Sequence, residues 1–99
     1  MSAEILSVAI WQPLPGKESA SLATTREIGS IVAAKGFGRD LLYRDRSQYV
    51  LLRFWKSLQA RGAALEDADL LRCWARLSNE IQMVKVYETL TEVPSEMAQ

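Results

Sequence analysis

Hydrophobic and polar positions alternate with a period of two in four short segments and recur with a helical period in two longer ones. The alternating segments predict strands over residues 5–11, 39–44, 48–55 and 83–90. The helical pattern predicts helices over residues 17–35 and 68–81, with a short helical turn near 57–60 between them. The chain therefore reads as strands and helices in the order β-α-β-β-α-β.

Turn and capping residues mark the ends of these segments. The first strand runs into the turn residues Pro13, Pro15 and Gly16, and the two middle strands are joined through Asp45, Arg46 and Ser47. Gly36 ends the first helix, Ser57 caps the short helical turn that Gly62 ends, and Asp67 caps the second helix. Gly29 lies inside the first helix, where glycine costs about 1 kcal/mol relative to alanine. We attribute it to a close contact with the sheet.

This order of elements is the split β-α-β pattern. It predicts an α+β, ferredoxin-like sandwich in which two helices cover one face of a four-stranded antiparallel sheet. Residues 1–99 form a single domain with a core over about 4–92, and 93–99 form a loose polar tail after the last strand.

Each strand has one apolar row and one mixed row of side chains. We expect the apolar rows under the helices; they are Leu6, Val8 and Ile10, Val50, Leu52 and Phe54, and Val84 and Val86. The mixed rows are Ser7, Ala9 and Trp11, then Tyr49, Leu51, Arg53 and Trp55, then Lys85, Tyr87 and Thr89. Such a face is too aromatic for water and too charged for a dry core. Pairing of two copies of the chain through this face, around a partly polar cavity, reconciles the two properties.

The strand over 39–44 admits two assignments, because Leu41 and Tyr43 compete with Leu42 for the mixed face. We prefer Leu41 and Tyr43. A shift of one residue exchanges these candidates.

Composition narrows the function classes. Twelve basic residues balance twelve acidic ones, so bulk charge attracts neither nucleic acid nor an anionic membrane. No apolar stretch is long enough to span a bilayer, and residues 1–10 lack the features of a signal peptide, so we expect a cytoplasmic protein. Cys73 is the single cysteine, which excludes an intramolecular disulfide. The sequence has no histidine and so lacks the commonest general base and metal ligand.

The chain resembles the dimeric α+β barrel proteins of the antibiotic-biosynthesis-monooxygenase type. The matching pieces are Pro15-Gly16-Lys17, Gly36-Phe37-Gly38, the strand over 49–55, and the junction Trp55-Lys56-Ser57-Leu58-Gln59-Ala60. The resemblance extends over roughly residues 4 to 92. It implies a homodimer with a pocket between each sheet and its helices or its partner. It also implies enzymes that oxidise aromatic or quinol substrates without a cofactor, or that degrade haem.

The haem-degrading branch has three signature residues. Where it carries an asparagine, a tryptophan and an axial histidine, this sequence has Ala9, Ala64 and Trp74. All three are missing, so we do not expect haem degradation. We expect no cofactor and no bound metal.

The candidate site residues all come from the predicted strands. Arg53 is a candidate to hold an oxyanion, and an ion pair at an interface is the equal alternative. Tyr43 and Tyr87 are candidate catalytic hydroxyls, although each is also an ordinary strand residue. Trp11, Tyr49 and Trp55 are candidate substrate-binding residues, and for Trp55 a packing anchor is the more frequent role.

Three further features have simpler explanations. Lys85 reads as a solvated rim residue, and Cys73 as a buried, inert thiol. The acidic group Glu66, Asp67 and Asp69 complements a helix N-terminus without any metal.

Two functions remain open from the sequence. The first is a cofactor-independent monooxygenase-like protein that acts on or binds a small aromatic or quinone-type molecule in a pocket of a homodimer. The second is a non-catalytic dimer of the same fold that binds a small ligand or another protein.

Overall fold

The computed structural model describes residues 4–94. Its strands are β1 (Ile5–Pro13), β2 (Gly38–Asp45), β3 (Gln48–Trp55) and β4 (Ile81–Leu90), and its helices are α1 (Glu18–Ala34), α2 (Leu58–Leu65) and α3 (Ala68–Leu77). Of the loose tail expected over 93–99, residues 95–99 lie outside the described part of the chain. None of the helices in the described residues is long and apolar enough to cross a membrane.

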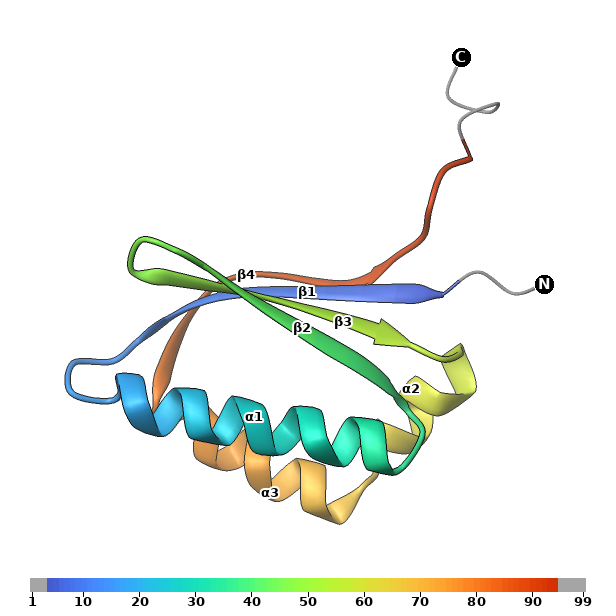
Figure 1. The fold of residues 1–99 in the computed structure, drawn as a ribbon. Coiled ribbons are helices and arrows are strands. Elements are labelled where there is room, and N and C mark those ends of the chain that lie inside the picture. Colours follow the sequence, from blue (N-terminus) through green and yellow to red (C-terminus); the bar gives the residue numbers. More distant parts are fainter. Residues whose placement is uncertain (1–3, 95–99) are drawn as a thin grey trace.

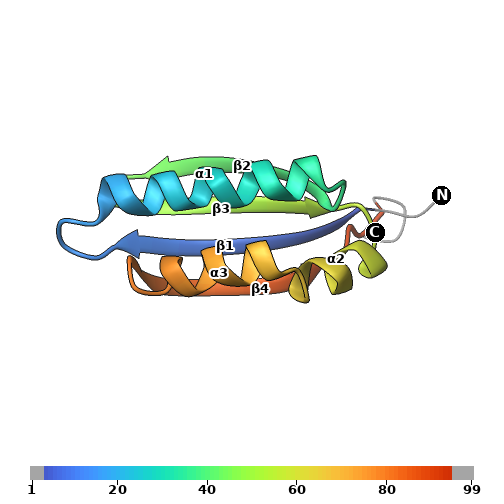
Figure 2. The same ribbon diagram turned by 90° about the horizontal axis from the view of Figure 1, so that it is seen from below.

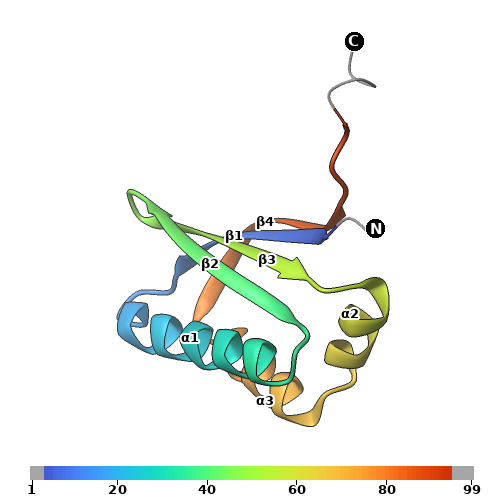
Figure 3. The same ribbon diagram turned by 45° about the vertical axis from the view of Figure 1, so that its right-hand side comes forward.

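The four strands form one antiparallel sheet in the order β2-β3-β1-β4. All three helices lie on the same side of this sheet, and the opposite side carries no element of the described chain (Figure 1). Helix α1 runs along the β2 and β3 side and α3 along the β1 and β4 side (Figure 2). Helix α2 lies at the end of β3, where the chain turns down toward α3 (Figure 3). The ferredoxin-like α+β sandwich predicted from the sequence is confirmed.

The second helical region differs from the prediction. Residues 58–65 form a full helix with Gly62 inside it, and α3 ends at Leu77 rather than at Ile81. The Ser57 hydroxyl accepts a hydrogen bond from the Ala60 amide, 3.0 Å away, and so starts α2 as expected. A turn over residues 78–80 follows α3, in which the Glu80 amide donates to the Leu77 carbonyl, and Ile81 pairs with Pro13 as the first residue of β4.

The expected orientation of the two faces is wrong for β1 and β3, whereas Lys85 and Tyr87 of β4 lie away from the helices as expected. The mixed rows of β1 and β3, with Trp11, Tyr49, Arg53 and Trp55, lie under the helices and are buried. The apolar rows of β1 and β3 lie on the opposite side, which we call the open face; it comprises Leu6, Val8, Ile10, Arg39, Leu41, Tyr43, Val50, Leu52, Phe54, Lys85, Tyr87 and Leu90. Leu41 and Tyr43 of the hairpin strand lie away from the helices, as the preferred assignment expected, but beside the apolar row of β3 rather than its mixed row, and Leu42 pairs with Leu51 under the helices. Val86, opposite Ala9, does lie on the helix side as expected.

The mixed rows tolerate burial because almost every polar atom in them has a hydrogen-bond partner. The Arg53 guanidinium meets Asp40, the Tyr49 hydroxyl donates to Glu18, and the Trp55 indole donates to Ser7. A buried polar group costs little when it is paired, so these large side chains contribute their apolar area to the core. The aliphatic rows on the open face are left half-buried or exposed.

Gly29 makes the close contact that its position in the helix suggested. A Cβ atom there would lie 3.3 Å from Asp40 Oδ2, so the absent side chain lets α1 approach the carboxylate of β2. Gly36 has φ of 72°, as expected for a residue that ends a helix in the left-handed region.

Candidate active site

A cavity of about 180 Å³ lies between the helix side of β1, β3 and β4 and the helices α2 and α3. Its wall combines aromatic, aliphatic and charged side chains. The lining residues are Ser7, Val8, Ala9, Leu51, Arg53, Trp55, Arg61, Leu65, Trp74, Met83, Val86 and Glu88.

Arg53 contributes a fixed guanidinium to this cavity. Its Nε and Nη2 donate to the two carboxylate oxygens of Asp40, each at 2.7 Å, and the two side chains are only 8% and 11% exposed. Of the five N–H groups of a guanidinium, these bonds use two and leave three. Arg53 also lies 5.6 Å from the ring centroid of Trp55. The sequence left open whether Arg53 binds a ligand or an ion-pair partner, and in the structure it borders the cavity while paired to a carboxylate of its own chain.

Trp55 is held in place by a chain of hydrogen bonds across three strands. Its indole N–H donates to Ser7 Oγ at 2.7 Å, and that hydroxyl donates to the backbone carbonyl of Glu88 at 2.5 Å. The indole is 2% exposed and packs against the core as well as bordering the cavity. Trp55 is therefore both an anchor and a wall.

Glu88 lies on the same face of β4 as Val86 and so reaches the cavity, next to a β-bulge. Leu6 pairs with Leu90 and Val8 with Tyr87, so two residues of β4, Glu88 and Thr89, lie opposite Ser7. Bulges re-aim side chains and are frequent beside active sites. Among the described residues that line the cavity, Glu88 is the sole carboxylate.

Arg61 enters the cavity wall from α2. Its side chain is half-buried, and within residues 4–94 it makes neither an ion pair nor a hydrogen bond through its guanidinium. Leu65, one turn later on the same face of α2, lines the same cavity. Trp74, at the position of the axial histidine in the haem-degrading branch, lines it from α3.

The six residues predicted for the site do not come together. Arg53 and Trp55 line the cavity, whereas Tyr43 and Tyr87 lie on the open face and are 55% and 42% exposed. Trp11 and Tyr49 lie under the helices, but in a neighbouring part of the core.

Trp11 and Tyr49 form a stacked pair with ring centroids 4.7 Å apart. The Tyr49 hydroxyl donates to Glu18 Oε2 at 2.6 Å. This hydrogen bond is the main reason why the pKa of Tyr49 is raised, and burial adds to the effect. Neither ring borders the cavity.

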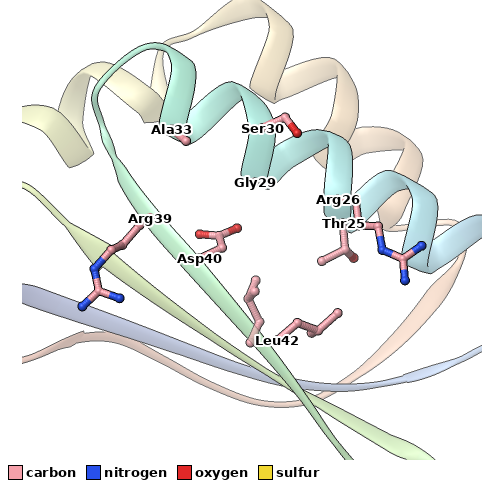
Figure 4. Close-up of a pocket in the computed structure, with 9 residues that line it drawn as sticks. Thr25, Arg26, Gly29, Ser30, Ala33, Arg39, Asp40 and Leu42 are labelled. Atoms are coloured by element: carbon pink, nitrogen blue, oxygen red, sulfur yellow. The ribbon is translucent and has the colours of Figure 1, made fainter.

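A second, more open groove of about 530 Å³ lies between α1 and β2. Figure 4 shows the Asp40 carboxylate between β2 and the part of α1 that carries Gly29 and Ser30. Because Asp40 is already engaged by Arg53, its charge is compensated. The carboxylate in this groove is therefore less available to a ligand or a proton, and we place the candidate site in the cavity on the other side of Arg53.

The remaining candidates have structural roles. Asp67 accepts the amide of Leu70 at the start of α3, and the Lys35 ammonium lies 2.6 Å from Asp67 and 2.9 Å from Asp69. Contact with Lys35 is the first reason why the pKa of each aspartate is lowered. Cys73 is buried, and burial raises the pKa of its thiol. Across residues 4–94 no three histidine, cysteine or acidic side chains cluster as a metal site would require.

Sequence reasoning missed Arg61, Trp74 and Glu88 as site residues. Trp74 was noted only as the residue that stands where the haem-degrading branch has its axial histidine. Arg61 lies in a helix that the glycine next to it concealed. Glu88 follows Val86 by two residues in β4, so strand alternation was the signal that could have found it.

The fold and the cavity together define a class of structure: a ferredoxin-like domain with a cavity between the sheet and its helices. The chain shares this fold with solved structures of the antibiotic biosynthesis monooxygenase type. The protein PA3566 from Pseudomonas aeruginosa superposes with a TM-score of 0.79 at 19% identity, over 95% of this chain and 98% of that one. A variant of SnoaB, a cofactor-independent oxygenase from Streptomyces nogalater, gives 0.77 at 17% identity, over 94% and 99%.

A structure of an antibiotic biosynthesis monooxygenase gives a TM-score of 0.77 at 15% identity, over 91% of this chain and 99% of that one. No protein-family model and no curated protein matches the sequence. At these identities the comparison establishes the fold, and the predicted resemblance is confirmed at that level.

Proposed function

We propose that the chain is a cofactor-independent monooxygenase that acts on a small, electron-rich phenolic ring in the cavity between the sheet and α2 and α3. The observation that carries the proposal is the meeting of a fixed guanidinium, two indoles and one carboxylate, from Arg53, Trp55, Trp74 and Glu88, around a single cavity. The fold of SnoaB, a cofactor-independent oxygenase, supports the same reaction class.

The size of the cavity suits a single ring. A cavity of about 150 Å³ holds benzene, whereas pockets for drug-sized ligands measure about 300–1,000 Å³. The value of about 180 Å³ falls close to the first figure. A hydroquinone fits this size class.

Each cavity residue has a chemical role in this proposal. Glu88 accepts the phenolic proton, since the sequence contains no histidine to do so. The free N–H groups of Arg53 hydrogen-bond to the developing oxyanion, and the indoles of Trp55 and Trp74 hold the ring and exclude water.

The redox balance needs no added reductant. A hydroquinone and dioxygen give a hydroxyquinone and water: one C–H bond and the O–O bond break, and one C–O bond forms. Four electrons from the substrate reduce dioxygen, so one oxygen atom enters the ring and the other leaves as water. The protein supplies orientation, proton transfer and charge stabilisation.

Oxygen uptake tests the proposal. A panel of hydroquinones and catechols is incubated with the protein in air, and uptake is followed with an electrode while products are identified by mass spectrometry. Enzyme-dependent uptake with incorporation of one atom from ¹⁸O₂ is expected. Glu88→Gln is expected to lower kcat by about 100-fold, within the usual range for loss of a general base. Uptake that Glu88→Gln and Trp74→Ala leave unchanged would contradict the assignment.

The proposal includes a homodimer formed through the open face. The rows of this face are mainly aliphatic and aromatic, with Arg39 and Lys85 as charged members on the two outer strands, and within the described residues no helix or loop covers them. Contiguous apolar surfaces of this kind mark contact sites. Tyr43 and Tyr87 then serve as interface residues rather than as catalytic hydroxyls. This arrangement puts the partner on the side of the sheet away from the cavity.

Ligand binding without turnover is the second candidate function. The small cavity and the compensated charge of Arg53 favour it, because a paired guanidinium stabilises developing negative charge less than a free one does. A hydroquinone that binds the cavity without oxygen uptake would select this function.

A further inference from the structure

We propose that Arg61 selects ligands that carry an anionic group, so that the cavity takes a single aromatic ring bearing a carboxylate or a comparable acidic substituent. This inference rests on the proposed function of the cavity as a ligand site. It adds the class of substrate, an aromatic ring with an anionic group, and names Arg61 as the residue that recognises this group.

The two arginines that line the cavity differ in whether a carboxylate of the chain pairs with them. Arg53 is bound through two hydrogen bonds to Asp40, which compensates its charge in part, and the proposed function assigns its free N–H groups to the phenolic oxygen rather than to a second anionic group. Arg61, the other arginine of the lining, makes no ion pair within the described chain although its side chain is half-buried. A guanidinium that water solvates only in part gains most from an anionic partner, and its planar array of donors matches a carboxylate.

The surroundings of Arg61 suit a ring with a charged end. Leu65 lies one helical turn from Arg61 and lines the same cavity with Trp74 and Met83. The apolar and aromatic wall accommodates the ring, and Arg61 on α2 is then available to its acidic substituent. Apolar pockets with a few polar groups derive their specificity from such groups.

Glu88 is the group that opposes anion binding. It is the sole carboxylate among the described lining residues and forms no ion pair with Arg61 in the structure. An anionic ligand must therefore approach a carboxylate as well as a guanidinium. Replacing Glu88 with glutamine removes the repulsion, so this change is expected to tighten anion binding while it lowers turnover.

Two isosteric probes separate charge from shape. Binding of 4-hydroxybenzoate and 4-hydroxybenzamide is measured near pH 7 by calorimetry and by quenching of the Trp55 and Trp74 fluorescence. The carboxylate is expected to bind at least about tenfold more tightly than the amide, as a charge-assisted hydrogen bond allows. In Arg61→Gln the two probes are expected to bind within about twofold of each other, and Arg61→Lys is expected to retain part of the preference.

The control is Arg26→Gln, which removes the same charge from an exposed position on α1 that does not line the cavity. It is expected to leave the preference unchanged. Equal binding of both probes to the wild type, or a preference that survives Arg61→Gln, overturns the role of Arg61 and leaves the proposed function standing. Failure of both probes and of hydroquinone to bind overturns the proposed function and this inference together.

Discussion

The guanidinium of Arg53 on β3 donates two hydrogen bonds of 2.7 Å to the carboxylate of Asp40 on β2, and both side chains are about nine-tenths buried. The two residues are direct neighbours across the strands. The pair fixes one wall of the cavity and connects it to the groove under α1.

Removing one partner is expected to destabilise the fold strongly. Asp40→Ala leaves the Arg53 guanidinium buried without a counter-charge, which costs about 3–5 kcal/mol in comparable cases. Urea unfolding measures the change. The double variant Asp40→Leu with Arg53→Met removes both charges and is expected to recover most of the stability. A loss below about 1 kcal/mol in Asp40→Ala would show that the pair contributes little.

The Arg53–Asp40 pair decides whether a substitution at Gly29 on α1 stabilises or destabilises the fold. Gly29→Ala gains about 1 kcal/mol by helix propensity, but the new Cβ lies 3.3 Å from Asp40 Oδ2. Because Arg53 holds Asp40 in place, we expect a net loss of about 1 kcal/mol in the wild type, within the range for overpacking. In an Asp40→Ala background the contact is absent, and Gly29→Ala is expected to stabilise.

Gly62→Ala is the matched control for Gly29→Ala. It lies in α2, and a Cβ atom there meets nothing within 4 Å. We expect it to stabilise by about 0.5–1 kcal/mol. Equal effects at both glycines, measured by thermal or urea unfolding, would remove the steric argument.

The order of elements was predictable from the sequence because it depends on local signals. Period-two alternation marks the strands, and residues such as Gly36 and Asp67 fix the ends of helices through their own backbone or side-chain geometry. Helix α2 was missed because Gly62 reads as a helix end. Nothing crowds that position, so a glycine is tolerated there at a modest cost.

The orientation of the sheet was not predictable because it depends on distant partners. Arg53 and Tyr49 are buried because Asp40 and Glu18 meet them, and no local pattern reveals those contacts. The same limit applies to the site. Arg53 and Trp55 stand out in the strand sequence, whereas Arg61 joins them only through the packing of α2 beside the sheet.

The hydrogen bond between Tyr49 and Glu18 makes stability fall at high pH. The phenol donates to the carboxylate at 2.6 Å, which raises the pKa of Tyr49 above its ordinary value near 10. A group whose pKa is raised by folding stabilises the fold below its unfolded pKa and loses that contribution as the pH rises through the folded pKa. The loss is therefore expected above about pH 10.

Tyrosinate absorbance checks this assignment in a Tyr43→Phe/Tyr87→Phe background, where Tyr49 is the single tyrosine. Glu18→Gln is expected to lower the pKa of Tyr49 toward the ordinary value and to weaken the alkaline loss of stability. An unchanged titration in Glu18→Gln would mean that burial alone shifts the phenol.

The proposed homodimer predicts that a charge in the middle of the open face separates the two copies. Leu52 lies at the centre of this face, where it pairs with Val8 and with Leu41. Leu52→Glu is expected to raise the dimer Kd by about 100-fold or more, because a carboxylate buried without a partner costs several kcal/mol. Analytical ultracentrifugation over a dilution series measures the change.

Leu71→Glu on α3 is the matched control for Leu52→Glu, since it makes the same chemical change at an exposed leucine away from the open face. Two outcomes would contradict a dimer formed through the open face. One is a wild-type chain that sediments as a monomer at every concentration. The other is a dimer that Leu71→Glu weakens while Leu52→Glu does not. If Leu52→Glu yields a folded monomer that still binds 4-hydroxybenzoate, the cavity is complete within one chain. This outcome is expected, because every described residue that lines the cavity comes from the same chain and its helices lie on the other side of the sheet.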